Sequence, residues 1–268
     1  MSTYQLRRGA DRACSRTEWL DSRHSFAFGS HYDPDNTCFG SLLAHNEDLL
    51  QPGPGYPPHA HRDVEILTWV LAGSLTHYEC GGESTVVSAG QLHHVSAGSG
   101  IRHTEFSTRP DQPVHLVQMW LSPDEVGPAP SHRLLEVGDR LASGQLVQLA
   151  SGLARPEDLA VLRIRQRAAA LWVARLPAGA GTTLPAAPYV HVFLTAGSVT
   201  VEATDSADAD GADGAGGATD GDATGRYSLV PGDALRITDG GGERVTADEP
   251  AELLVWQLGQ RHSAVVVA

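Results

Sequence analysis

Basic residues are scarce in this chain of 268 residues. Only 19 lysines and arginines stand against 32 aspartates and glutamates, which gives a formal net charge of −13. A chain of this sign lacks the basic face that sequence-independent binding of nucleic acid requires, and it is poorly suited to an anionic membrane surface. The composition therefore argues against nucleic acid and the membrane surface as direct partners, while a protein partner stays open.

Cysteines and long apolar runs are also few. The three cysteines, Cys14, Cys38 and Cys80, are odd in number, widely spaced and without a CxxC pattern, so they predict no disulfide framework. The N-terminal stretch MSTYQLRRGADRACS has no apolar core of a signal peptide. No apolar run is long enough to cross a membrane. We expect a protein of the reducing cytoplasm.

The chain does contain a series of short strand signals. The stretch DVEILTWVLAGSLTHYEC is rich in β-branched and aromatic residues and is interrupted by a turn at AGS. Further strand-like runs follow in STVVSAGQLHHVSAGSGIRHTEFS and PVHLVQMWLSP. Short strands at this spacing, separated by Gly and Ser turns, are typical of antiparallel sandwiches and barrels. We expect an all-β fold with few short helices.

The two halves of the chain resemble each other. LTWVLAGSLTHYE, near residue 70, is echoed by HVFLTAGSVTVEA near residue 195, and VVSAGQLHHVSAG is echoed by SLVPGDALRITDG. Self-similarity of this kind predicts a duplicated unit. We expect two antiparallel β-barrel or jelly-roll domains packed together, at residues 1–135 and 136–268.

Residues 203–225 differ from the rest of the chain. They read ATDSADADGADGAGGATDGDATG, with six aspartates, no basic residue and no large apolar residue. Such a segment cannot bury enough surface to offset the entropy lost on ordering, so it predicts a disordered acidic insert in the C-terminal domain. The spacing of its aspartates fits neither an EF-hand loop nor a nonapeptide repeat that would bind Ca²⁺.

The thirteen histidines are unevenly placed, and six of them lie between residues 59 and 103. Two pairs are notable, His59-x-His61 and His103-x-Glu105, because a spacing of two points both side chains to one face of a strand. Imidazole and carboxylate together are typical ligands of Fe, Mn, Ni, Cu or Zn. One pair alone is more often an ordinary hydrogen-bonded pair. The second pair at the same spacing favours a metal site, and residues 136–268 contain neither HxH nor HxE.

The surroundings of these pairs carry a family resemblance. The spacing of the first cupin-superfamily motif is met by Gly53, His59, His61, Glu65 and Gly73. Within the cupins, WLDSRHSFAFGSHYDP, YPPHAHRDVEILTWVLAG, SAGSGIRHTEFS and HLVQMWLSP, in this order, resemble the pirin family. The resemblance covers most of residues 1–135 and continues more weakly through AAALWVARLPAG and VTADEPAELLVWQLG. It implies a bicupin fold, in which only the N-terminal cupin binds metal.

The pirin resemblance also implies a ligand set. The ligands would be His59, His61, His103 and Glu105, the same four residues that the spacing indicates. They would hold one divalent transition metal, for which we expect Fe(II), with Mn, Ni, Cu or Zn as alternatives. Glu65, a ligand in many other cupins, is not one in pirins. It shares the strand parity of the histidine pair, so we expect it either to orient a ligand imidazole or to pair near the barrel mouth.

The sequence departs from the pirin pattern at two places. Ala60 stands where proline is usual, which gives the strand more freedom without removing a ligand. His93 and His94 stand where pirins tend to have glutamine followed by a large apolar residue. His93 falls where other cupins place a metal-binding histidine, so it is a candidate fifth ligand or pocket acid–base, although a hydrogen-bonding role is the simpler interpretation. His77 and His115 are expected to be structural.

The resemblance implies an activity as well, because some pirins oxidise quercetin. The substrates would be a flavonol and O₂. Glu105 is our candidate for the catalytic base that removes the 3-hydroxyl proton before the ring opens with loss of CO. The first alternative is a non-catalytic, metal-binding regulatory or redox-sensing protein that acts through protein partners. The second is an enzyme that acts on an unrelated small metabolite.

Overall fold

The structure is a computed structural model that describes residues 1–153, 161–204, 222 and 224–260. Strands dominate the described residues, and the helices among them are three short 3-10 turns, Gly9–Asp11, Pro34–Asn36 and Gly138–Ser143. The prediction of an all-β chain with few short helices is confirmed. None of the helices in the described part has the length and apolar character of a membrane span. The acidic insert predicted at residues 203–225 lies almost entirely outside the described residues.

The described chain divides into two compact units. The N-terminal unit holds residues 12–138 and 149–167, and the C-terminal unit holds residues 1–11, 139–148 and 168–260. These units differ from the predicted domains, residues 1–135 and 136–268. Strand β1 (Thr3–Arg7) belongs to the C-terminal unit, because it pairs with β20 (Ala234–Gly240). Strand β13 (Val147–Ser151) begins in the C-terminal unit and ends in the N-terminal unit, where it pairs in parallel with β14 (Leu162–Arg163).

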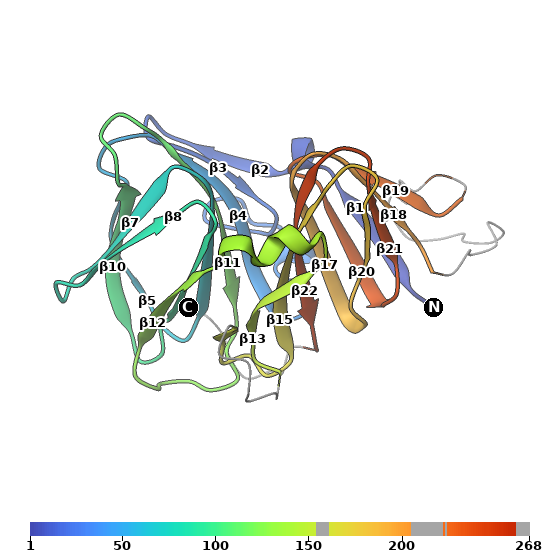
Figure 1. The fold of residues 1–268 in the computed structure, drawn as a ribbon. Coiled ribbons are helices and arrows are strands. Elements are labelled where there is room, and N and C mark those ends of the chain that lie inside the picture. Colours follow the sequence, from blue (N-terminus) through green and yellow to red (C-terminus); the bar gives the residue numbers. More distant parts are fainter. Residues whose placement is uncertain (154–160, 205–221, 223, 261–268) are drawn as a thin grey trace. The chain divides into compact units, whose positions relative to one another are not determined.

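The N-terminal unit contains two antiparallel sheets (Figure 1). One orders its strands β12-β9-β6-β11-β4-β3-β2, and the other β5-β10-β7-β8. The strands are β2 (Ala13–Arg16), β3 (Leu20–His24), β4 (Leu42–Leu50), β5 (Tyr56–His61), β6 (Glu65–Ala72), β7 (Ser74–Glu79), β8 (Ser84–Ser88), β9 (Gln91–Ser96), β10 (Ile101–Ser107), β11 (Val114–Leu121) and β12 (Ser131–Glu136).

A shared core joins these two sheets. Leu20, Leu50 and Leu116 of the seven-stranded sheet pack in one cluster with Leu75 and Val87 of the four-stranded sheet. Apolar residues from the inner faces of two sheets that pack together define a β-sandwich. Strand β6 is buried along most of its length, which explains why EILTWVLA is nearly continuously apolar instead of alternating.

The C-terminal unit is also made of antiparallel sheets. Five of its strands run in the order β1-β20-β17-β22-β15 and four in the order β16-β21-β18-β19. The strands not yet given are β15 (Ala169–Leu176), β16 (Gly181–Thr183), β17 (Ala187–Ala196), β18 (Val199–Glu202), β19 (Arg226–Leu229), β21 (Arg244–Ala247) and β22 (Ala251–Leu258). One apolar cluster, which includes Val192, Leu253, Val201 and Val245, draws residues from both sheets.

The predicted duplication is visible in this strand order. The run β9-β6-β11-β4 corresponds to β20-β17-β22-β15, and β5-β10-β7-β8 corresponds to β16-β21-β18-β19. The turns correspond as well, since Gly73 after β6 and Gly197 after β17 both have a φ of 75°. A Cβ would lie 2.4 Å from the carbonyl oxygen of Pro113 at the first position and 2.1 Å from that of Pro250 at the second. Both turns therefore require glycine.

Candidate metal centre

Two paired strands position the four predicted ligands. Strand β5 carries His59 and His61, and its antiparallel neighbour β10 carries His103 and Glu105. His103 lies opposite His59, and the register shifts between His103 and Glu105, as at a β-bulge. Gly55, just before β5, permits this close pairing. It has a φ of 63°, and a Cβ there would lie 2.1 Å from the carbonyl oxygen of Glu105.

Three of the four residues form one imidazole group. The ligand-capable atoms of His59, His61 and His103 lie within 4.8 Å of one another. Nε2 of His103 is 2.8 Å from Nε2 of His59. The ring centroid of His61 is 4.8 Å from that of His59 and 5.0 Å from that of His103, nearly perpendicular to both rings. Three converging imidazoles are a donor set that suits a first-row transition metal.

A second group contains Glu105 and shares His103 with the first. The ligand-capable atoms of His77, His103 and Glu105 also lie within 4.8 Å of one another, and all three side chains are buried. Nδ1 of His77 is 3.4 Å from Oε1 of Glu105 and 3.1 Å from Nδ1 of His103. The four predicted ligands therefore fall into two groups that meet at the ring of His103, and not into a single one.

His77 is the member of this cluster that the sequence did not reveal. We expected a structural histidine, but it is only 1% exposed and lies directly opposite Glu105 in the pairing of β7 with β10. Residues opposite each other in an antiparallel pair present their side chains on the same face. The signal available in the sequence was His77-x-Glu79, which has the same spacing as His103-x-Glu105.

Glu105 is held from both sheets of the sandwich. Nε2 of Gln118, on β11, donates a hydrogen bond of 3.0 Å to Oε2 of Glu105, and Oε1 of Gln118 accepts one of 3.0 Å from the indole N–H of Trp120. Burial alone would raise the pKa of Glu105. The hydrogen bond with His77, the other imidazole beside it and the hydrogen bond from Gln118 outweigh burial and lower that pKa well below its usual range. Glu105 is therefore ionised at neutral pH.

Burial has a simpler effect on the imidazoles. It lowers the pKa of His61 to about 4 and that of His103 to about 3. Both rings are therefore neutral at neutral pH, which is the form in which imidazole binds a metal. Neutral imidazoles beside an ionised carboxylate match a divalent transition metal better than Ca²⁺ or Mg²⁺. The residues present thus fit the metal that the family resemblance implies.

Comparison with known proteins identifies the family. A sequence model of the Pirin family matches residues 7–121. A protein of Mycobacterium tuberculosis named "Putative quercetin 2,3-dioxygenase" is 43% identical over 257 residues, which cover 96% of this chain and 96% of that protein. This chain belongs to the pirin family. The family match includes β2 to β11 of this pirin, and so every strand that carries a predicted ligand.

Other relatives of this pirin come from Escherichia coli. The crystal structure of the bacterial pirin YhhW in complex with nickel(II) matches with a TM-score of 0.80 at 28% identity, over 96% of this chain and 100% of that one. An Escherichia coli protein named "Quercetin 2,3-dioxygenase" is 39% identical over 127 residues, 47% of this chain and 55% of that protein. The fold is thus shared with YhhW over most of the chain.

Glu65 of this pirin lies apart from the predicted ligands. It begins β6 in the seven-stranded sheet, whereas the histidine pair lies on β5 in the four-stranded sheet, so the expectation of a common strand parity is wrong. The carboxylate of Glu65 accepts three hydrogen bonds, from Nε2 of His94 at 2.8 Å, Oγ of Ser96 at 2.5 Å and the backbone N–H of Arg165 at 3.0 Å. These contacts support a pairing role within the fold and not the orientation of a ligand imidazole.

His93 lies behind the cluster. It is on β9, is 1% exposed, and its ring meets that of His77 edge-on at 4.9 Å. Its Nε2 has no hydrogen-bond partner in the described part of the chain, and burial lowers its pKa to about 3. His93 belongs to neither ligand group, so the geometry does not favour the fifth-ligand role. His115 pairs with Glu47 at 2.9 Å, away from the cluster.

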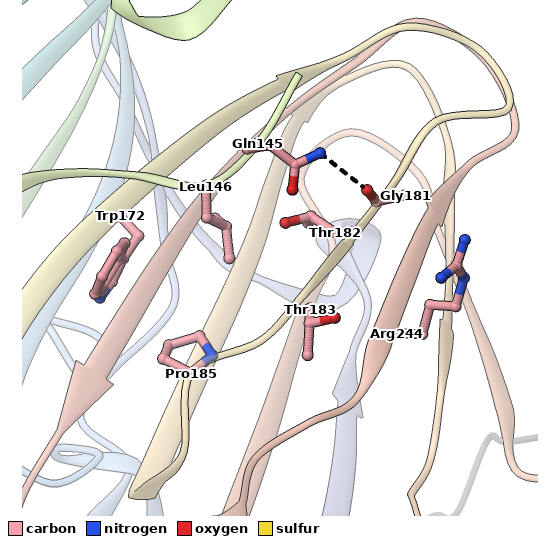
Figure 2. Close-up of a pocket in the computed structure, with 8 residues that line it drawn as sticks. All are labelled: Gln145, Leu146, Trp172, Gly181, Thr182, Thr183, Pro185 and Arg244. Atoms are coloured by element: carbon pink, nitrogen blue, oxygen red, sulfur yellow. Dashed lines mark hydrogen bonds between the residues drawn. The ribbon is translucent and has the colours of Figure 1, made fainter. Parts of the chain in front are cut away.

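Surface hollows lie on corresponding strands of the two units. In the N-terminal unit, a hollow of about 530 Å³ is lined by His61, Arg62 and Arg102, among others, and so reaches the cluster. In the C-terminal unit, a hollow of about 520 Å³ lies over β16 and β21, the counterparts of β5 and β10 (Figure 2). Thr183 and Arg244, which pair in register, line it, and none of its eight lining residues is a histidine, a cysteine or a carboxylate.

Proposed function

We propose that this pirin is a mononuclear metal-dependent dioxygenase that cleaves flavonols such as quercetin with O₂. The observation that carries the proposal is the cluster on β5, β7 and β10, in which four imidazoles lie near Glu105, with His61 and His103 neutral and Glu105 ionised. The names of relatives that cover the chain, such as the Mycobacterium tuberculosis protein, supply the substrate class. Localisation in the cytoplasm agrees with the three free cysteines.

Four residues would hold the metal: His59, His61, His103 and Glu105. The metal would be Fe(II), and the donor set also suits Mn, Ni, Cu and Zn. When bound, it would supply Lewis acidity that makes a flavonol 3-hydroxyl easier to deprotonate, together with a place where the electron-rich anion and O₂ meet. The side chains of the cluster would carry out the rest of the chemistry.

Glu105 would accept the proton of the 3-hydroxyl. It is in the ionised form that a base needs, because His77 and Gln118 hydrogen-bond its two oxygens. The same hydrogen bonds reduce its proton affinity, so transfer is favoured only from a hydroxyl whose own pKa has been lowered in the site. Glu105 is 3% exposed, which keeps bulk water from competing for that proton.

The hollow at His61 would admit the substrate. Its volume of about 530 Å³ is within the range of small-molecule sites. One wall of the histidine cluster is aromatic, since the ring of Trp120 lies 4.9 Å from that of His61, edge-on.

Turnover by the reconstituted protein tests this function. The metal-free chain is loaded anaerobically with Fe(II), Mn(II), Ni(II) or Cu(II) in turn, and the loss of quercetin and the release of CO are followed under air. At least one metal is expected to support both, and His103→Ala is expected to abolish metal binding and turnover together. If the protein binds metal but none of the four metals supports turnover, the dioxygenase hypothesis is wrong and the regulatory or redox-sensing function is favoured. Turnover by His103→Ala without bound metal would refute the site.

A further inference from the structure

His77 contacts both halves of the cluster. One of its ring nitrogens, Nδ1, is 3.4 Å from Oε1 of Glu105. Nδ1 of His103 lies 3.1 Å from the same nitrogen of His77 and 3.4 Å from the other, Nε2. The side chain of His77 is fully enclosed, with 1% exposure, and its position is fixed because it stands opposite Glu105 in the register of two central strands. His77 is therefore placed to act on two of the predicted ligands at once.

The proton positions around Glu105 follow from its other partners. The indole N–H of Trp120 can only donate, so the oxygen of the Gln118 amide faces Trp120 and its NH₂ group faces Glu105. Gln118 thus satisfies Oε2. Oε1 is left to His77, and because an ionised carboxylate only accepts hydrogen bonds, Nδ1 of His77 must carry a proton.

This assignment fixes the ring of His103 as well. With its proton at Nδ1, His77 can accept only at Nε2. The contact of 3.1 Å between its Nδ1 and Nδ1 of His103 is then not a hydrogen bond, and Nε2 accepts from Nδ1–H of His103 at 3.4 Å. With its proton at Nδ1, His103 presents an unprotonated Nε2 toward His59, from which it is 2.8 Å away. A metal-binding histidine usually donates its second N–H to an acceptor of this kind, which sets the tautomer and the ring orientation.

We propose that His77 is the positioning residue of the metal centre. It accepts a hydrogen bond from His103 and donates one to Glu105, so a single side chain selects the nitrogen of His103 that faces the metal and holds the carboxylate in place. The inference rests on the metal centre of the proposed function, but it does not depend on which substrate is used. His77 supplies none of the ligand atoms in this arrangement.

Metal binding by variants of the full-length chain tests the proposal without any turnover. His77→Leu removes both hydrogen bonds while keeping an apolar, buried side chain. His77→Gln retains one donor and one acceptor. His103→Ala removes a ligand. His24→Leu is the matched control, because His24 is a buried histidine of the same unit whose ring nitrogens contact Ser15 and Asn46. Circular dichroism selects conditions in which all variants are folded.

Two readouts are measured: Ni(II) affinity by competition with a chelator, and the visible absorption spectrum of bound Co(II). His77→Leu is expected to weaken Ni(II) binding by about 10- to 100-fold, in the range for partners of ligand histidines, and to change the Co(II) spectrum. His77→Gln is expected to restore most of the affinity, and His24→Leu to match the wild type in both readouts.

Three results would overturn the proposal. Wild-type affinity and spectrum in His77→Leu would show that His77 does not act on the centre. A loss as complete as that of His103→Ala, without recovery in His77→Gln, would make His77 a ligand instead of a positioning residue. Failure of the wild-type chain to bind Ni(II) or Co(II) would remove the metal centre itself, and this inference with it.

Discussion

The carboxylate of Glu65 lies 2.8 Å from Nε2 of His94, and both side chains are buried. Burial alone would raise the pKa of Glu65, but hydrogen bonds from His94, Ser96 and the backbone of Arg165 lower it. A buried ion with a full set of donors is stable in place, and removing one partner leaves an uncompensated group. Glu65 therefore serves the fold and lies outside both ligand groups.

Replacement of Glu65 should separate stability from metal binding. Glu65→Ala leaves His94, Ser96 and one backbone N–H without their acceptor, so we expect the free energy of unfolding to fall by about 3–5 kcal/mol. Ni(II) stoichiometry should stay at the wild-type value below the melting temperature, because Glu65 belongs to neither ligand group. Thermal denaturation followed by circular dichroism and elemental analysis measure the two effects. Loss of metal from a folded Glu65→Ala variant would contradict this separation.

Gln118 should affect the proton affinity of Glu105 in the candidate metal centre. Gln118→Glu places a second carboxyl group about where the amide now donates to Glu105 at 3.0 Å. Two carboxylates at this distance disfavour joint ionisation, so one of their pKa values rises. We expect Ni(II) binding by Gln118→Glu to weaken as the pH falls from 8 to 6, more steeply than in the wild type. Titrations at both pH values measure the slope, and parallel slopes would rule out the coupling.

The histidine cluster could be predicted because its signals are local. A spacing of two within a strand fixes the face of both side chains whatever the rest of the fold does, and this holds for the pair on β5. His77 could not be assigned in this way. Its role depends on the pairing of β7 with β10, and the register between strands is set by the packing of the whole sheet.

Glu65 shows where counting alternate residues along a strand gives a wrong prediction. Only three residues separate His61 from Glu65, but the chain leaves one sheet and enters the other between them. Asp63, with a φ of 51°, makes this turn. Counting alternate residues is valid only along one continuous strand. The placement of β1 was likewise not predictable, because Thr3 pairs with Thr238 and nothing in the local sequence signals a partner so distant.

Buried neutral histidines should make the metal-free protein sensitive to acid. Burial lowers the pKa of His93 and of His103 to about 3, whereas each is about 6.5 in an unfolded chain. Below pH 6.5 the unfolded state therefore binds more protons, and stability falls as the pH falls. Each histidine contributes about 1.4 kcal/mol per pH unit in this window.

Urea unfolding of the metal-free wild type between about pH 7 and pH 5 measures that loss. His93→Gln should reduce the slope by the share of one histidine, because the amide does not titrate. An unchanged slope in His93→Gln would mean that His93 gains its proton in the folded state as readily as in the unfolded one.

Asp48 should respond to pH in the opposite sense. Its carboxylate accepts hydrogen bonds from Tyr56 at 3.0 Å and Ser22 at 2.5 Å, but burial, reinforced by the negative charge of Glu105, raises its pKa from 3.8 to about 6. A raised folded-state pKa gives stability that is complete below the unfolded pKa and is lost as the pH rises through about 6. At higher pH the ion is buried at a cost of up to about 3 kcal/mol. Asp48→Asn, which keeps the shape without the charge, is therefore expected to be more stable than the wild type at about pH 8 and to lose about half of that advantage at about pH 5. Urea unfolding of both proteins at the two pH values measures the difference. If the advantage of Asp48→Asn does not depend on pH, the substitution acts through shape or hydrogen bonding and not through the charge of Asp48.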